Sequence, residues 1–208
     1  MSARRTGPAW SPPWRARERR PPTPDRTRGV EHHLEILHSV AETVSRSLDV
    51  EQVLKTALDA LTQVTGHEIA SLHLLSEDGV TLKLRGERGM SPRLRQVNES
   101  LPIGEGLIGK VAASGETVRL DHAAADPDLF PPAKRAVKTD HIRGSVCVPI
   151  RSRGRVLGTL SLGRQTVDRF TEPEVALLEA TAHQIGIALD NAKLYSESQR
   201  QLEELKLT

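Results

Sequence analysis

The sequence of 208 residues has little cysteine, few aromatic residues and no long apolar run. Its single cysteine, Cys147, excludes an intrachain disulfide and any metal or iron–sulfur site built from several cysteines, and this usage is typical of a reducing compartment. No apolar run approaches the roughly 18 residues that cross a bilayer, and the Arg-rich start lacks the apolar core of a signal peptide. We therefore expect a cytoplasmic protein without a membrane span.

Aromatic residues make up only 2% of the chain, so the core has to be aliphatic. The charge is also unevenly distributed: residues 1–29 carry eight Arg, six Pro and two acidic residues, a net charge of +6 that leaves −4 for the rest. Proline removes backbone donors and arginines repel one another, which predicts a disordered tail. Nucleic-acid binding would depend on this tail, through its arginines and two tryptophans, and a solvated extension is the alternative.

Helical periodicity begins at residue 30. A seam, meaning a narrow apolar stripe with steps of three and four residues, predicts a helix over about 30–47 that suits a partner helix. A second helix is expected between Asp49 as N-cap and Gly66 as terminator. A last helix over 172–206 has Thr171 and Glu174 as a capping box.

Two hairpins lie between these helices. Strands are predicted over 68–75 and 80–88, turning at Asp78-Gly79, and over 143–151 and 155–162, turning at 152–154. Between the hairpins, LPIGEG predicts an extended piece, LIGKVAASG a short helix, and ETVRL a short strand. Residues 121–140 contain three prolines and are expected to form a long irregular crossover that covers a site.

Several of these segments together resemble a GAF domain over residues 30–198: ASLHLLSEDG, LPIGEGLIGKVAASGE, SVCVPIRSRGRVLGTLSLGR and FTEPEVALLEATAHQIGIALDNAKLY. The resemblance implies an α+β fold, similar to PAS domains, with an antiparallel sheet of about six strands. The N- and C-terminal helices would pack on one face of the sheet, and a loop-covered small-molecule pocket would lie on the other. Such domains commonly bind a ligand and act on an output module as parallel dimers.

The resemblance favours a sensor whose C-terminal helix regulates an output module. Residues 199–208, with the ending LEELKLT, resemble the start of the coiled-coil linker before a histidine kinase, which favours a two-component system. Two apolar seams would form a four-helix bundle in a homodimer. The predicted dimer interface consists of Leu34, Leu37, Ala41, Val44, Leu178, Ala182, Ile185, Leu189 and Ala192.

The second predicted hairpin has two unlike faces. Ser145, Cys147, Thr159 and Ser161 alternate with aliphatic residues, so one face is small and mildly polar. Two interpretations are open: these residues allow a helix to approach closely, or they leave room for a ligand. In the second case the pocket would also include Arg119, Asp121, His141 and Arg143 from the loops, and the two arginines would suit an anionic or carbonyl-bearing ligand.

No catalytic residue, metal site or identified cofactor is expected. Bilin attachment lacks a Cys-His pair, His141 matches the haem-binding position only inexactly, and the cyclic-nucleotide signature N-K-F-D-E is absent. His32 and His33 are adjacent on a helix and point about 100° apart, which does not suit one metal ion.

Two other hypotheses remain. The chain would be a ligand-free dimerisation or scaffold module if Leu129, Phe130 and Val137 filled the space beneath the crossover. It would be an enzyme of the free methionine-(R)-sulfoxide reductase type if Cys147 were a nucleophile. Those enzymes resemble GAF domains but use several cysteines, because a second thiol reduces the sulfenic intermediate. Cys147 alone on a buried strand is better interpreted as an apolar filler.

Overall fold

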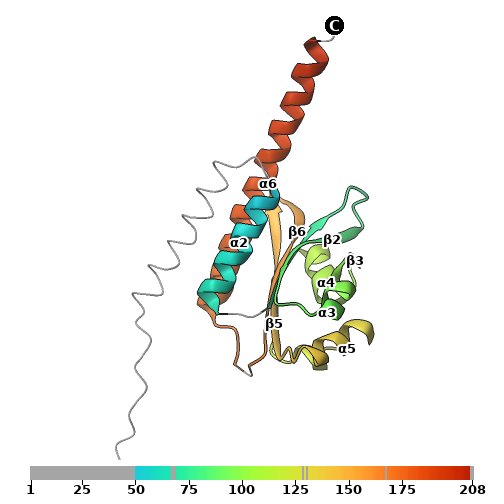
Figure 1. Ribbon diagram of the computed structural model, residues 1–208, viewed down its shortest axis with the longest axis vertical. Helices are drawn as coiled ribbons and strands as arrows, with labels where there is room; N and C mark the ends of the chain where they lie inside the picture. Colours follow the sequence, from blue (N-terminus) through green and yellow to red (C-terminus); the bar gives the residue numbers. More distant parts are fainter. Residues whose placement is uncertain (1–49, 67–68, 128, 130, 167, 207–208) are drawn as a thin grey trace, which may run out of the picture.

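Two hairpins form the centre of a six-stranded antiparallel sheet with the strand order β3-β2-β1-β6-β5-β4. The computed structural model describes residues 50–66, 69–127, 129, 131–166 and 168–206 (Figure 1). The α+β fold expected from the sequence is confirmed. The strands are β1 (Ile69–Leu75), β2 (Thr81–Arg88), β3 (Ser100–Pro102), β4 (Val118–Leu120), β5 (Gly144–Ser152) and β6 (Arg155–Arg164).

Both hairpin turns form where the sequence predicts them. In the first turn, Asp78 accepts hydrogen bonds from the backbone N–H groups of Val80 and Thr81 at 2.9 and 3.0 Å, and Gly79 has a φ of 72°. In the second turn, Arg153 and Gly154 both have positive φ angles, 49° and 76°, as two-residue hairpin turns of the right twist require.

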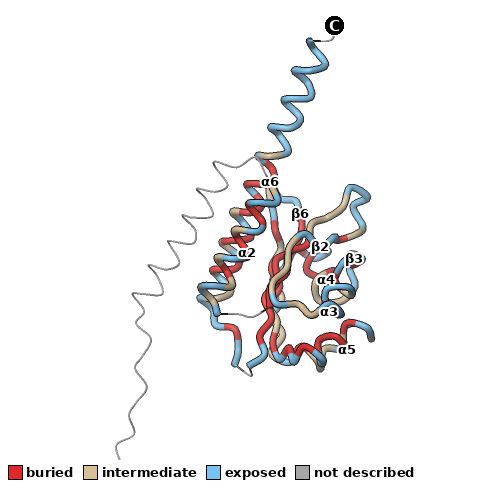
Figure 2. The backbone as a smooth tube through the Cα atoms, viewed as in Figure 1, coloured by how far each residue is buried: buried red, intermediate tan, exposed pale blue. Residues whose placement is uncertain are grey.

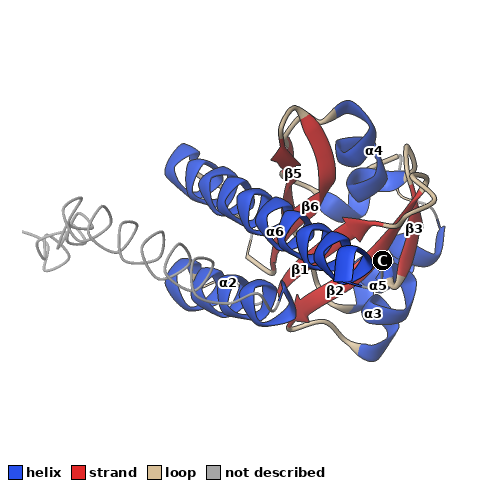
Figure 3. Ribbon diagram, turned by 90° about the horizontal axis from the view of Figure 1, so that it is seen from above, coloured by secondary structure: helices blue, strands red, loops and turns tan. Residues whose placement is uncertain are grey.

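One face of the sheet is covered by two helices, α2 (Val50–Thr65) and α6 (Glu172–Lys206), which lie side by side (Figure 3). The aliphatic residues of β5 and β6 point to this side, as their alternation predicts. The main core thus lies between these helices and the sheet; its fully buried members include Leu54, Leu58, Leu61, Leu72, Val146, Val148, Ile150, Leu160, Leu178, Ala182 and Ile185.

The opposite face carries three short helices, α3 (Pro92–Asn98), α4 (Gly106–Ser114) and α5 (Pro131–Thr139), and the 3₁₀ turn η1 (Ala123–Ala125). Helix α5 contradicts the expectation of an irregular crossover over 121–140. Its two prolines occupy the first turn, where a helix has no use for their missing N–H groups. Ala133, Ala136 and Val137 then recur at helical spacing and are buried.

The C-terminal helix begins and ends at the predicted residues. Thr171 Oγ1 accepts from the N–H of Glu174, and the Glu174 carboxylate accepts from the N–H of Thr171 at 2.6 Å, which confirms the capping box. Beyond Asp190 the helix leaves the body of the domain, and its residues are mostly exposed (Figure 2).

The predicted dimer seam on α6 needs correction. Leu178, Ala182 and Ile185 are completely buried against the protomer's own sheet and α2, so they are not available to a partner helix. Their spacing of three and four residues fits a helix face in the core as well as it fits a dimer seam, and here it belongs to the core. The other half of the predicted interface, Leu34, Leu37, Ala41 and Val44, lies outside the described residues.

Gly186 determines how closely α6 approaches the sheet. It is buried, and a Cβ atom at this position would collide with the backbone carbonyl of Arg151 on β5. The backbone cannot yield as a flexible side chain would, so any larger residue must push the helix away from the sheet.

We predict that Gly186→Ala lowers the free energy of unfolding by about 1–3 kcal/mol because of this collision. Helix propensity alone would give the opposite sign, because alanine stabilises a free helix by about 1 kcal/mol relative to glycine. A loss of stability therefore indicates the collision. Urea unfolding would measure the change, with His183→Ala on the exposed side of α6 as a control expected to stay within about 0.5 kcal/mol. Equal or higher stability of Gly186→Ala would contradict the close approach.

Candidate functional site

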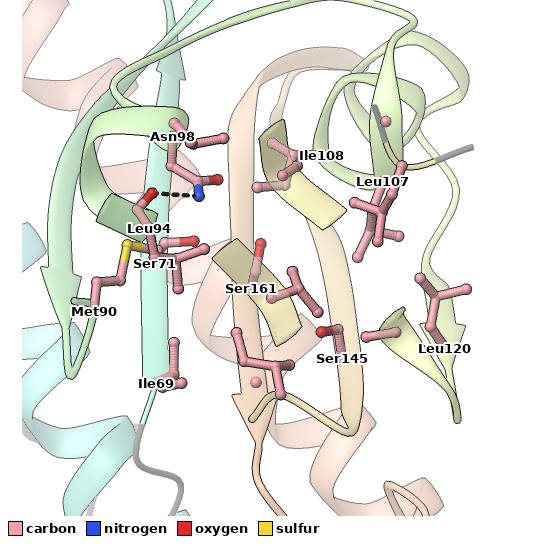
Figure 4. Close-up of a pocket in the computed structure, with 18 of the residues that line it drawn as sticks. Ile69, Ser71, Met90, Leu94, Asn98, Leu107, Ile108, Leu120, Ser145 and Ser161 are labelled. Atoms are coloured by element: carbon pink, nitrogen blue, oxygen red, sulfur yellow. Dashed lines mark hydrogen bonds between the residues drawn. The ribbon is translucent and has the colours of Figure 1, made fainter. Parts of the chain in front are cut away.

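A cavity of about 100 Å³ lies between the sheet and the three short helices (Figure 4). Its floor includes Ser71, Ser161 and Ser145 from the adjoining strands β1, β6 and β5. Its other walls, which we call the canopy, are mainly apolar side chains of α3, α4, α5 and the segments beside them: Met90, Leu94, Val97, Leu107, Ile108, Leu120, Ala123, Leu129, Ala133, Val137 and Ile142.

Polar groups other than the serines reach the cavity at two places. Asn98 ends α3 and donates from Nδ2 to the carbonyl of Leu94 at 2.8 Å, which leaves its Oδ1 as an acceptor. Glu105 is exposed at the N-cap of α4, and its side chain makes no capping hydrogen bond. Among the lining residues that the structure describes, Glu105 is the single charged one.

Two of the eight predicted pocket residues, Ser145 and Ser161, line this cavity. Cys147 and Thr159 lie on the same sheet face but are completely buried and do not line it. The hydroxyl of Ser161 donates to Cys147 Sγ at 3.3 Å, so the serine connects the cavity floor to the buried thiol. The predicted small and polar face therefore exists, with helices over part of it and a cavity over another part.

The four predicted loop residues do not gather around the cavity. Arg119 donates to the carbonyl of Phe170 and to the carboxylate of Glu172, at 3.0 and 2.8 Å. Asp121 pairs with Arg169 at 3.1 Å. His141 and Arg143 are exposed on either side of Ile142, whose side chain is the one that lines the cavity.

Several lining residues were not predicted from the sequence. The sequence pattern could have predicted Ser71, because in IASLHLL it alternates with the aliphatic residues that face α2 and α6. Asn98 and Glu105 come from α3 and the N-cap of α4, and the packing of these elements on the sheet gives no signal in local periodicity.

His73 connects β1 to the canopy. Its side chain is completely buried, and its Nε2 donates to the backbone carbonyl of Asn98 over 2.9 Å. Burial lowers the pKa of His73 from 6.5 to about 4, because the charged imidazolium loses its hydration, and the bond to Asn98 opposes this shift only partly. The imidazole is therefore neutral at pH 7.

Cys147 has the properties of a core residue. Burial raises the pKa of its thiol to about 12, while the hydroxyls of Ser161 and Thr159 counteract this only weakly. The thiolate is the nucleophilic form of cysteine, and at pH 7 almost none of it is present here.

Arg164 joins the end of β6 to the start of α6. Its guanidinium, 7% exposed, donates to the carbonyl oxygens of Asp168 and Arg169 and to the Glu174 carboxylate at 2.8 Å. It also lies over the ring of Phe170, 3.9 Å from the centroid. The two preceding residues of β6, Leu162 and Gly163, line the cavity.

Comparison with known proteins identifies the family. A family profile described as GAF domain matches residues 47–190, which is more than half of the chain. The chain belongs to the GAF family.

Relatives of this GAF domain include regulators and sensor kinases. A Nif-specific regulatory protein of Herbaspirillum seropedicae is 26% identical over 86% of the chain and 33% of its own length. The sensor histidine kinase YhcY of Bacillus subtilis is 25% identical over 80% of the chain and 44% of its own length. The chain therefore spans less than half the length of these relatives.

Solved structures support the same fold. The GAF domain of a phosphoenolpyruvate-protein phosphotransferase from Coxiella burnetii has a TM-score of 0.69 at 24% identity, covering 80% of this chain and 98% of that one. A free methionine-R-sulfoxide reductase from Neisseria meningitidis, solved with its substrate, has a TM-score of 0.67 at 21% identity, covering 78% and 91%.

The described residues offer neither a membrane-spanning helix nor a cluster of metal ligands. No helix there combines the length and apolarity that crossing a bilayer requires. Nowhere in the same part of the chain do three His, Cys, Asp or Glu side chains come together as metal ligands could.

We predict that His73 makes the GAF domain less stable as the pH falls from about 6.5 towards 4. In this range His73 becomes protonated in the unfolded state but stays neutral in the folded state, so acidification favours unfolding. Between pH 7 and 4.5 the wild type should lose about 2 kcal/mol more than His73→Gln, which keeps a donor for the Asn98 carbonyl. Urea unfolding of both proteins across this range would measure the difference, and parallel pH profiles would contradict the prediction.

Proposed function

We propose that this GAF domain senses a small molecule in the cavity above β1, β5 and β6 and regulates an output module through α6. The observation that carries the proposal is the cavity itself. A ligand-free scaffold would fill this space with side chains, yet about 100 Å³ is open between Leu129, Val137 and the serine floor.

The contacts of β6 supply a route from the cavity to α6. Leu162 and Gly163 line the cavity, and Arg164 holds the first turn of α6 through Glu174. A ligand that displaces this strand end also displaces an ion pair that is largely buried. Such a pair is costly to break, so the start of α6 would move with the strand.

The direction of α6 and the identity of the relatives support an output module. The helix extends well beyond the sheet (Figure 1). The relatives include proteins named as regulators and as a sensor histidine kinase, and each is more than twice as long as the segment matched here. We favour a histidine kinase of a two-component system as the output, with another regulator as the alternative.

A parallel homodimer would pair the projecting part of α6. Apolar side chains there form an exposed stripe that begins just before it, at Ile187, and continues with Leu194, Tyr195, Leu202 and Leu205. Successive helix residues are about 100° apart, so these five fall within one arc of about 100°, on the other side of the helix from Leu178 and Ile185. An exposed stripe of this kind suits a coiled coil between two copies.

Catalysis is not part of the proposed function. The fold is shared with free methionine-R-sulfoxide reductases, but Cys147 is the chain's one cysteine, buried and protonated. It lacks both the thiolate and the resolving thiol that such a reaction requires.

We expect native mass spectrometry of the protein purified from its own host to detect a retained small molecule. Ala133→Leu fills the cavity from α5 and should remove that molecule, whereas Ala113→Leu adds the same atoms on the exposed side of α4 and should retain it. Urea unfolding would verify that both variants are folded. A ligand that persists in folded Ala133→Leu would contradict the cavity as its site.

We also expect Leu194→Glu with Leu202→Glu to convert a dimer into a monomer in sedimentation equilibrium, because two charges would enter the exposed stripe. Ser196→Glu introduces the same charge on the opposite side of α6 and should leave the dimer intact. The thermal unfolding midpoint should differ little among the wild type, the double variant and Ser196→Glu. A wild-type monomer, or a dimer that survives both substitutions, would refute this interface.

A further inference from the structure

We infer that the ligand of the cavity is small and uncharged, with an apolar body and one hydroxyl or carbonyl oxygen, and that anions are rejected. This inference rests on the proposed function, since it specifies the ligand of the same cavity. Three independent features of the cavity support it: its size, the position of charged groups around it, and the distribution of its polar atoms.

The size limits the ligand to a few non-hydrogen atoms. The cavity measures about 100 Å³, and an apolar cavity of about 150 Å³ is known to accept benzene or xenon. A nucleotide or another drug-sized ligand needs roughly 300–1,000 Å³. A molecule of about five or six non-hydrogen atoms therefore matches the available space.

The charges around the cavity disfavour an anion. Among the described residues that line it there is no Lys, Arg or His, and the single charged group is the carboxylate of Glu105 at its rim. Arg119 is engaged by Phe170 and Glu172. The cations of α5, Lys134, Arg135 and Lys138, surround a separate surface hollow that shares only Leu129 with the cavity.

A carboxylate or phosphate that entered the cavity would lose its hydration without gaining a cation, and it would pass a negative charge at the rim. Removing an unpaired charge from water is far more costly than removing a hydroxyl. The arginines in the sequence, which first suggested an anionic ligand, thus lie outside the site that the fold builds.

Most of the polar side chains lie on one side of the cavity, the floor, while Asn98 and Glu105 are polar residues on the canopy side. The floor offers the hydroxyls of Ser71, Ser145 and Ser161, and the Ser161 oxygen can still accept after donating to Cys147. The canopy opposite is otherwise apolar, with Leu94, Ile108 and Val137 among its members. A ligand with one oxygen at the floor and a short hydrocarbon towards the canopy matches both sides.

The test compares two probes of equal chain length, n-butanol and butyrate, in NMR titrations of the purified full chain. We expect saturable binding of n-butanol in the wild type and at least tenfold weaker binding of butyrate. Ala133→Leu should abolish n-butanol binding, while the matched variant Ala113→Leu should keep it.

The charge at the rim is tested separately. Glu105→Arg should strengthen butyrate binding at least fivefold and change n-butanol binding less than twofold, with little risk to folding because Glu105 is exposed. Glu116→Arg, an exposed site just after α4, makes the same change of charge outside the cavity lining and should alter neither probe.

The outcomes separate the ligand class from the proposed function. Butyrate binding as tight as n-butanol and lost in Ala133→Leu would overturn the uncharged ligand but leave a sensing cavity. Unchanged butyrate binding in Glu105→Arg would overturn the selection by charge. Binding of neither probe to the folded wild type would overturn both the ligand class and the use of this cavity for sensing.

Discussion

The structure depends on one constraint, the burial of both faces of the central strand β6. Every residue from Gly158 to Arg164 is buried, so two layers of helices must cover the sheet. The aliphatic residues of the strand pack tightly against α2 and α6. On the other face, the small residues at 161 and 163 do not reach the canopy everywhere, and a cavity remains above them, while Thr159 is completely buried. The same two-residue alternation therefore produces a closely packed core on one face and a cavity on the other.

The hairpin of β5 and β6 holds α6 at two separated points. At one end Arg164 binds Glu174, and at the other Ser152 donates to Asp190 at 2.8 Å while Arg153 pairs with the same carboxylate. Between these points Gly186 allows the helix to touch the strand backbone. Beyond Asp190 the described residues of the helix are mostly exposed. The proposed signal would therefore pass from the hairpin to the part of α6 that extends beyond the sheet.

Local signals in the sequence predicted the elements that have local causes. Thr171 and Glu174 marked the start of α6, and Asp78-Gly79 marked a turn, because capping and turn geometry involve neighbouring residues. Helix α5 was missed because its prolines suggested a break, although they occupy the first turn. The seam of α6 was assigned to a dimer because periodicity identifies an apolar face of a helix but does not identify the element that packs against it. Asn98 and Glu105 reach the cavity through tertiary packing, which no local pattern contains.

The canopy and the cavity are energetically linked. Helices α3, α4 and α5 have seven, nine and nine residues, too short to be stable alone, and depend on packing over the sheet. His73 adds a hydrogen bond from the sheet to the end of α3. The small buried cluster around Ile69, Leu94 and Val137 holds this layer with less apolar contact than the main core. We therefore expect the canopy to open more readily than the layer of α2 and α6, and a ligand that contacted both floor and canopy would favour the closed arrangement by mass action.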